Sequence, residues 1–208
     1  MDIFEQESFL KKLKLHEEYN KSQTKSGQLL ELKNADLAGI DLSNMAIDSA
    51  ILFEVNFNNA NLTSADMFGC YLISSSFRDA KLTAAILNKA EADYASFENA
   101  ILCNVTAHKT SFVNANLKNA NLKDADLTYA DLKNAELRDA NLENTILRET
   151  NLKGVDFNGA YFFNVDLRGA KGVDSILADW IYIGPQGNCV RVEGEEVKSW
   201  FAKECDKE

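Results

Sequence analysis

The sequence repeats with a period of five residues over most of its length. Every fifth residue of the range 32–167 is Leu, Ile, Met or Phe, except Ala92 and Ala107. A second column, two residues earlier in each unit and spanning the range 30–165, is mostly alanine. Neither column contains a charged residue, whereas the remaining positions are mostly polar. Two uncharged columns in fixed register predict one continuous core along residues 30–171.

A period of five fits neither an α-helix, with about 3.6 residues per turn, nor a flat strand, in which about every second side chain shares a face. It fits a chain that turns a corner every five residues. In each unit the two uncharged residues point inward and the residue between them points outward, as in a short strand. The next two residues make the turn, which accounts for the Asn, Asp, Gly and Ser found there. Such units predict a solenoid in which each coil pairs with its neighbours.

The units have the form Ala-(Asp/Asn)-Leu-X-X, as at residues 35–37, and resemble those of pentapeptide-repeat proteins. The resemblance covers residues 30–171 without an insertion. It implies an all-β solenoid, a right-handed quadrilateral β-helix with four units in each coil. About seven coils at about 4.8 Å between paired strands would make a rod roughly 34 Å long. Residues 20 apart would then stack, and Phe57, Phe77 and Phe97 are expected to form a ladder of rings in the core.

Residues 1–29 precede the repeat. An open solenoid end would expose unpaired edges and needs a cap, and two placements stay open for this segment: across that end, or over an apolar side of the coil. The segment predicts an amphipathic helix over residues 2–19, followed by a polar connector. At its start, Asp2 with Glu5 resembles a capping box. His16 lies on this helix and is expected to be exposed to solvent.

Residues 172–208 follow the repeat, and are expected to close its other end. Residues 180–183 and 189–192 flank a GlyProGlnGlyAsn turn and predict a β-hairpin. Residues 195–203 predict a short amphipathic helix. The candidate C-terminal contact consists of Trp180, Trp200 and Phe201. These side chains are expected to cover the last coil; the alternative is a dimer contact, which the resembled family sometimes places at this end.

A small group of outward positions is apolar where a solenoid surface should be polar. In the 20-residue register these positions fall on two adjoining faces of the early coils. They are Ile51, Phe53, Tyr71, Ile73, Phe68 and Ile86. A contiguous exposed apolar patch is typical of an interface. Three occupants stay open at this point: the N-terminal segment of the same chain, a second copy in a homodimer, or another protein.

The residues that carry chemistry in enzymes are sparse here. The two histidines are His16 and His108, and no pair of Cys or His residues has metal-ligand spacing. The glycine-containing turn lacks the Lys-Ser/Thr of a phosphate-binding loop. We therefore expect no catalytic, cofactor or metal site, and no enzyme. Free thiols are expected, and a disulfide between Cys189 and Cys205 is the alternative in an oxidising compartment.

The net charge of −10 indicates no general attraction to nucleic acid or anionic membranes. The sequence contains no stretch of about 18 apolar residues, so no membrane span is predicted. The N-terminal residues lack the basic and apolar regions of a secretory signal. The sequence therefore predicts a cytoplasmic protein that binds neither nucleic acid directly nor membranes.

Two functions remain. The first is a rigid rod that presents its surface to a protein partner, whose identity the sequence does not give. The second comes from the resemblance, because some pentapeptide-repeat proteins mimic B-DNA and bind type II topoisomerases such as gyrase. Residues 30–171 carry a net charge of −6, whereas about 34 Å of B-DNA carries roughly 20 negative charges. They also lack the loops that interrupt the coil in such members, so we rank the DNA mimic second.

Overall fold

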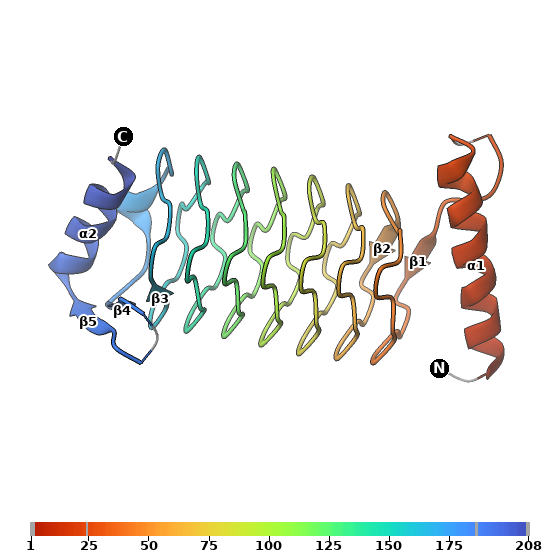
Figure 1. Ribbon diagram of the computed structural model, residues 1–208, viewed down its shortest axis with the longest axis horizontal. Helices are drawn as coiled ribbons and strands as arrows, with labels where there is room; N and C mark the ends of the chain where they lie inside the picture. The colour runs from red at the N-terminus through yellow and green to blue at the C-terminus, as the bar shows by residue number, and fades with distance from the viewer. Residues whose placement is uncertain (1–2, 24, 186, 207–208) are drawn as a thin grey trace.

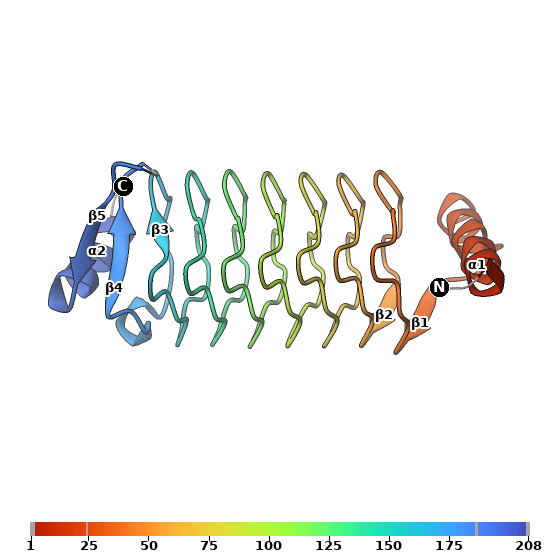
Figure 2. The same cartoon turned by 90° about the horizontal axis from the view of Figure 1, so that it is seen from below.

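The chain forms a stack of coils with a helix at each end (Figure 1). The computed structural model describes residues 3–23, 25–185 and 187–206. In chain order the elements are α1 (Ile3–Lys21), β1 (Glu31–Lys33), β2 (Ile51–Phe53), β3 (Tyr161–Phe162), the short helix η1 (Val173–Ser175), β4 (Trp180–Ile183), β5 (Val190–Glu193) and α2 (Glu195–Cys205). Figure 2 shows the same arrangement from a perpendicular direction, with α1 and α2 at opposite ends.

Each coil contains four five-residue units. Parallel bridges join residues 20 apart, beginning with Asp36 and Asn56 and continuing to Asn151 and Lys171. Backbone hydrogen bonds run in both directions between coils; for example, the N–H of Asn56 donates to the carbonyl of Ala35 at 2.9 Å. Most pairings are single bridges rather than long strands, because each side of the coil holds only a few extended residues between two turns.

The corners of the coil explain the Asp and Asn of the repeat. The last residue of each unit has a left-handed backbone, as at Asn59 with a φ of 59°. The N–H of Ala60 then donates to the carbonyl of Phe57 at 3.0 Å and closes the turn. Earlier in the unit, the carboxylate of Asp41 accepts the N–H of Ser43 at 2.9 Å, which fixes the entry to the turn. The same side-chain bond recurs in many units and needs a short oxygen-bearing side chain at that position.

The inward columns form a closely packed core. Nearly all residues of the alanine and leucine columns between residues 47 and 162 are fully buried. The predicted ladder of rings is confirmed: the ring centroids of Phe57 and Phe77 are 5.0 Å apart, and those of Phe77 and Phe97 are 4.8 Å apart. Both pairs are nearly parallel, with interplanar angles of 10° and 2°. Side chains therefore fill the tube.

Helix α1 lies across the N-terminal end of the stack (Figures 1 and 2). Its Phe9 and Leu13 are buried against the core. The helix extends two residues beyond the predicted end, to Lys21. The proposed capping box at Asp2 lies outside the described residues. In the described part of the chain, neither helix has the length and hydropathy needed to cross a bilayer.

At the other end the coil register changes by one residue before the chain leaves the repeat. Tyr161 pairs with Tyr182, a separation of 21 instead of 20, after the short helix η1. Strand β4 pairs parallel with β3 and antiparallel with β5, so the predicted hairpin continues the coil as a small sheet. Helix α2 then places Val197 and Phe201 in the core.

Candidate protein-interaction surface

The six outward apolar residues lie on the two sides of the coil that meet at the turn at Gly69. Ile51, Phe53, Tyr71, Ile73, Phe68 and Ile86 are called the corner patch below. Ile51 and Tyr71 are bridged neighbours on one side, and the rings of Phe53 and Tyr71 are 6.2 Å apart. Phe68 lies around the corner, on the other side of the turn at Gly69. The 20-residue register thus places Ile51 beside Tyr71.

The corner patch is open to solvent at its centre. Tyr71 is 40% exposed and Phe68 is 39% exposed, whereas the other members are half-buried by their neighbours along the rod. Helix α1 lies across the end of the tube, beyond β1, and does not lie over the side that carries β2 (Figures 1 and 2). Of the three occupants considered from sequence, the described part of the N-terminal segment therefore leaves Tyr71 and Phe68 exposed.

Charged groups border the corner patch. Glu31 in β1 pairs with Ile51 in β2, and Glu91 in the following coil is bridged to Tyr71. The ammonium group of Lys89 lies 5.2 Å from the centroid of the Phe68 ring. Burial raises the pKa of the nearby Asp48 carboxyl, and the Asp66 carboxylate adds to this effect.

The candidate C-terminal residues pack against the last coil. Phe201 is fully buried, with its ring 5.6 Å from Phe157. Trp200 is half-buried, with its ring 5.1 Å from Phe162. Trp180 lies further out, half-buried under the guanidinium of Arg191 at 5.0 Å. Trp200 and Phe201 thus contribute mainly to covering the core.

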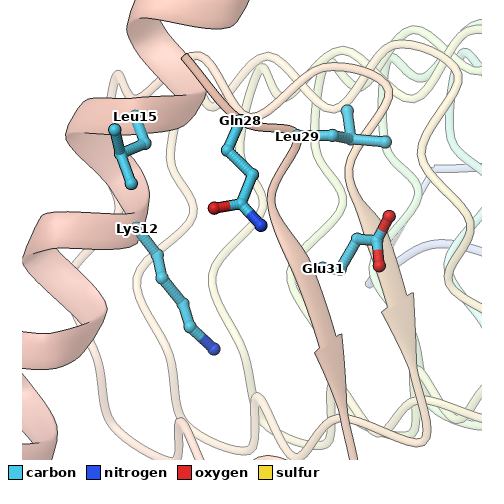
Figure 3. A pocket seen from close by; sticks show the side chains of 5 residues that line it. All are labelled: Lys12, Leu15, Gln28, Leu29 and Glu31. Carbon is cyan, nitrogen blue, oxygen red and sulfur yellow. The ribbon is translucent and has the colours of Figure 1, made fainter.

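Shallow pockets lie near both ends of the rod. The one at the C-terminal end has a volume of about 330 Å³ and is lined largely by apolar residues. It is formed by Phe162, Phe163, Asn164, Val165, Ile183, Gly184, Trp200 and Glu204. The other lies between α1 and β1, has a volume of about 190 Å³, and is shown in Figure 3. It is lined by Lys12, Leu15, Gln28, Leu29 and Glu31.

The junction of α1 with the first coil corrects one expectation. His16 was expected to be exposed, but it is fully buried. Its Nδ1 accepts the backbone N–H of Leu30 at 3.1 Å, and the side-chain amide of Asn20 lies 3.2 Å from its Nε2. That amide also donates to the Asp48 carboxylate at 2.7 Å. Burial lowers the pKa of His16, against the opposing attraction of Asp48.

A sequence signal for this role exists. His16 follows Phe9 and Leu13 by seven and three residues, a spacing that places all three on one side of a helix. In later units the N–H equivalent to that of Leu30 donates to a carbonyl three residues earlier, as from Ala50 to Ile47. Leu30 begins the first coil, and its N–H donates to the imidazole of His16 in place of such a turn carbonyl.

The remaining titratable groups are scattered along the rod. All four cysteines are free thiols. Burial raises the pKa of Cys70 to about 12 and that of Cys205 to about 11. Within the described residues, no group of three or more His, Cys, Asp or Glu side chains is placed to hold a metal ion.

Comparisons with solved structures return pentapeptide repeat proteins. HetL from the cyanobacterium Nostoc sp. strain PCC 7120, involved in heterocyst differentiation regulation, is 24% identical over 76% of this chain and 95% of its own, with a TM-score of 0.36. A pentapeptide repeat protein of the Arabidopsis thaliana thylakoid lumen is 30% identical over 51% of this chain and 70% of its own, with a TM-score of 0.40. QnrB1, a plasmid-mediated fluoroquinolone resistance protein, is 15% identical over 83% of this chain and 98% of its own, with a TM-score of 0.37. No match was found among curated proteins.

The family model for pentapeptide repeats gives a more direct assignment. Its copies overlap along the coil and together run from residue 31 to residue 171. This range matches the segment in which residues 20 apart are bridged. Members of the family form right-handed quadrilateral β-helices, in agreement with the four-unit coil described above. The chain belongs to the pentapeptide repeat family.

Proposed function

We propose that this protein is a non-catalytic interaction module, a β-helical rod of about seven coils that binds a protein partner through its corner patch. In this proposal α1 closes one end of the rod, and β4, β5 and α2 close the other. The observation that carries the proposal is the exposure of Tyr71 and Phe68 beside four further apolar side chains. A monomeric protein rarely leaves such a group open without a binding role.

The rod suits this role because the patch is held on a rigid support. Each side of the coil is fixed by backbone hydrogen bonds to the coils before and after it, as for Tyr71, whose N–H donates to Ala50 at 2.9 Å. The inward neighbour Leu72 is fully buried, so the outward side chains keep a constant spacing. A partner therefore meets a preformed surface and loses little free energy to ordering it.

The test is affinity capture from lysate of the source organism. The wild-type protein should retain a partner that Phe53→Asp/Ile73→Asp loses. Ile101→Asp is the control, because Ile101 is an outward apolar residue on another face and is 38% exposed. Circular dichroism and thermal unfolding confirm that each variant is folded. Capture of the same partner by all three proteins would argue against the corner patch as the contact surface.

A DNA mimic that binds gyrase remains the second candidate, supported by the acidic charge of the coil and by the family. Several carboxylates of the later coils are paired with basic groups, including Asp156 with Arg138 and Glu143 with Lys123, which weakens the resemblance to a polyanion. Inhibition of gyrase supercoiling at low micromolar protein would favour this candidate. A homodimer is a third arrangement, and light scattering of the purified protein measures it directly.

A further inference from the structure

The corner patch lies between carboxylates along the axis of the rod. One outward column reads Glu31, Ile51, Tyr71 and Glu91, as the bridges between successive coils show. Its two apolar members are therefore flanked by an acid at each end. Glu54 borders the patch as well, directly after Phe53. The patch thus combines apolar contact area with an acidic border.

These acids are available to a partner. Glu31, Glu54 and Glu91 are exposed, and within the described part of the chain none of them forms an ion pair. Other carboxylates of the coil are neutralised within the protein; Glu98, for example, lies 3.2 Å from Arg78. Two lysines also border the patch. The ammonium group of Lys89 lies over the Phe68 ring, and Lys33 pairs with Phe53 at the same end as Glu31, so the acidic border is strongest at the end that carries Glu91.

The charge pattern disfavours a second copy as the occupant. In a two-fold contact centred on Ile51 and Tyr71, each subunit would present the same column to its partner. An antiparallel pair would place Glu31 against Glu91 at both ends, and a parallel pair would place each glutamate against its own copy. Like charges at the edge of an apolar contact oppose association.

The backbone pattern favours a helical partner over an extended one. The N–H and carbonyl groups on this side of the coil are used between coils, as in the bonds from Ile51 to Leu30 at 2.9 Å and from Leu52 to Tyr71 at 2.8 Å. An extended segment would therefore find no free sheet edge here with which to pair. A helix satisfies its own backbone and can lie with one apolar side on the patch.

We propose that the corner patch binds an amphipathic helix whose apolar side is flanked at both ends by Lys or Arg. This proposal rests on the proposed function and specifies the partner's chemistry. Glu31 and Glu91 are three coil steps apart, about 14 Å at about 4.8 Å per step. Helical positions about seven to eleven residues apart share one side and span about 10–16 Å, so the partner's basic residues are expected at that separation.

The experiment uses two labelled helical peptides of about 16 residues with identical apolar residues. One carries Lys at both ends of the apolar side, and the other carries Glu there. Fluorescence anisotropy measures binding to the full-length protein. The basic peptide is expected to bind at least about tenfold more tightly than the acidic one at low salt, with the difference shrinking at high salt. Tyr71→Ser/Ile73→Ser is expected to abolish its binding.

A matched pair of charge reversals tests the acidic border. Glu91 and Glu136 are both exposed and occupy the same position of their units, but Glu136 lies on another face. Glu91→Lys is expected to weaken binding of the basic peptide about 2- to 10-fold, and Glu136→Lys to leave it unchanged.

The outcomes separate the two proposals. If both peptides bind equally well and Tyr71→Ser/Ile73→Ser abolishes the binding of both, the basic character of the partner is refuted. The corner patch would still be supported as the contact surface. If the basic peptide binds Tyr71→Ser/Ile73→Ser as tightly as the wild-type protein, the corner patch is not its binding site. Failure of the basic peptide to bind the wild-type protein would overturn the amphipathic basic helix as the occupant.

Discussion

Lowering the pH should loosen α1 from the end of the coil, because His16 holds this junction in its neutral form. Its Nδ1 accepts the Leu30 N–H at 3.1 Å, so that nitrogen has no proton in the docked state. Protonation would place two N–H groups against each other inside a buried contact. Leu30 itself is buried, and water cannot easily replace the lost acceptor.

The size of the effect follows from the buried donor. Leaving a buried N–H without an acceptor costs about 1–3 kcal/mol. Helix α1 is held in addition by Phe9 and Leu13, so its docking should weaken without unfolding the coil. His16→Leu should therefore increase the opening of α1 about 5- to 150-fold at neutral pH. His16→Asn keeps an oxygen acceptor close to the position of Nδ1 and should lose much less.

The direction with pH follows from the lowered pKa. The docked state binds fewer protons than the undocked state, in which the pKa returns to about 6.5. The contribution of His16 to docking is therefore complete above about pH 6.5 and is lost as the pH falls through the lower pKa of the docked state. Asp48, linked through Asn20, opposes this loss by attracting the imidazolium, and Asp66 lies near Asp48.

Hydrogen exchange followed by mass spectrometry measures this opening directly. Peptides from residues 8–21 should exchange faster at pH 5.5 than at pH 7.5 after correction for the intrinsic rate, whereas peptides from the central coils should not. His16→Asn should remove most of this pH dependence. If the wild type and His16→Asn responded equally to pH, His16 would not be the group responsible.

Three further predictions concern the core, the corners and the thiols. Phe77→Ala removes the middle ring of the ladder and should cost about 3–5 kcal/mol in urea unfolding; a loss below about 1 kcal/mol would contradict the packing described. Asp131 accepts the N–H of Lys133 at 3.0 Å and the Asn151 amide at 2.9 Å. Asp131→Ala should therefore cost about 1–2 kcal/mol, whereas Glu136→Ala, at an exposed position, should cost little by the same assay. Cys70 is buried with a pKa raised to about 12, so iodoacetamide at pH 8 should label it only after unfolding; rapid labelling of the folded protein would show that this core position opens.

The repeat could be predicted in detail because its pattern is both local and periodic. The two uncharged columns specify which side chains point inward, and the 20-residue register then places Phe57 above Phe77 and Ile51 beside Tyr71. The hairpin and the last helix were also predicted to within two residues. Their boundaries coincide with a Gly-Pro turn and with a change of period.

The junctions were harder to predict because they depend on how separate segments dock. In the described part of the connector after α1, Gly27 packs closely against the helix backbone and the N–H of Gln28 donates to the carbonyl of Leu15 at 2.9 Å. The sequence pattern does not reveal these contacts, so it allowed the helix to lie over the patch or across the tube. The role of His16 depends on that choice, since its partner Leu30 belongs to the first coil. The exposure of Tyr71 and Phe68 depends on the same choice, and therefore became clear only from the structure.

Photo-crosslinking in cells of the source organism tests the central claim most directly. A photoreactive amino acid is placed at Tyr71 in one variant and at Ile101 in another; these residues are 40% and 38% exposed at equivalent positions of different faces. The corner patch predicts a discrete crosslinked protein from position 71 that is absent from position 101 and disappears when Ile73→Ser is added. The same crosslinked protein from both positions, or from position 101 alone, would contradict the corner patch as the contact surface.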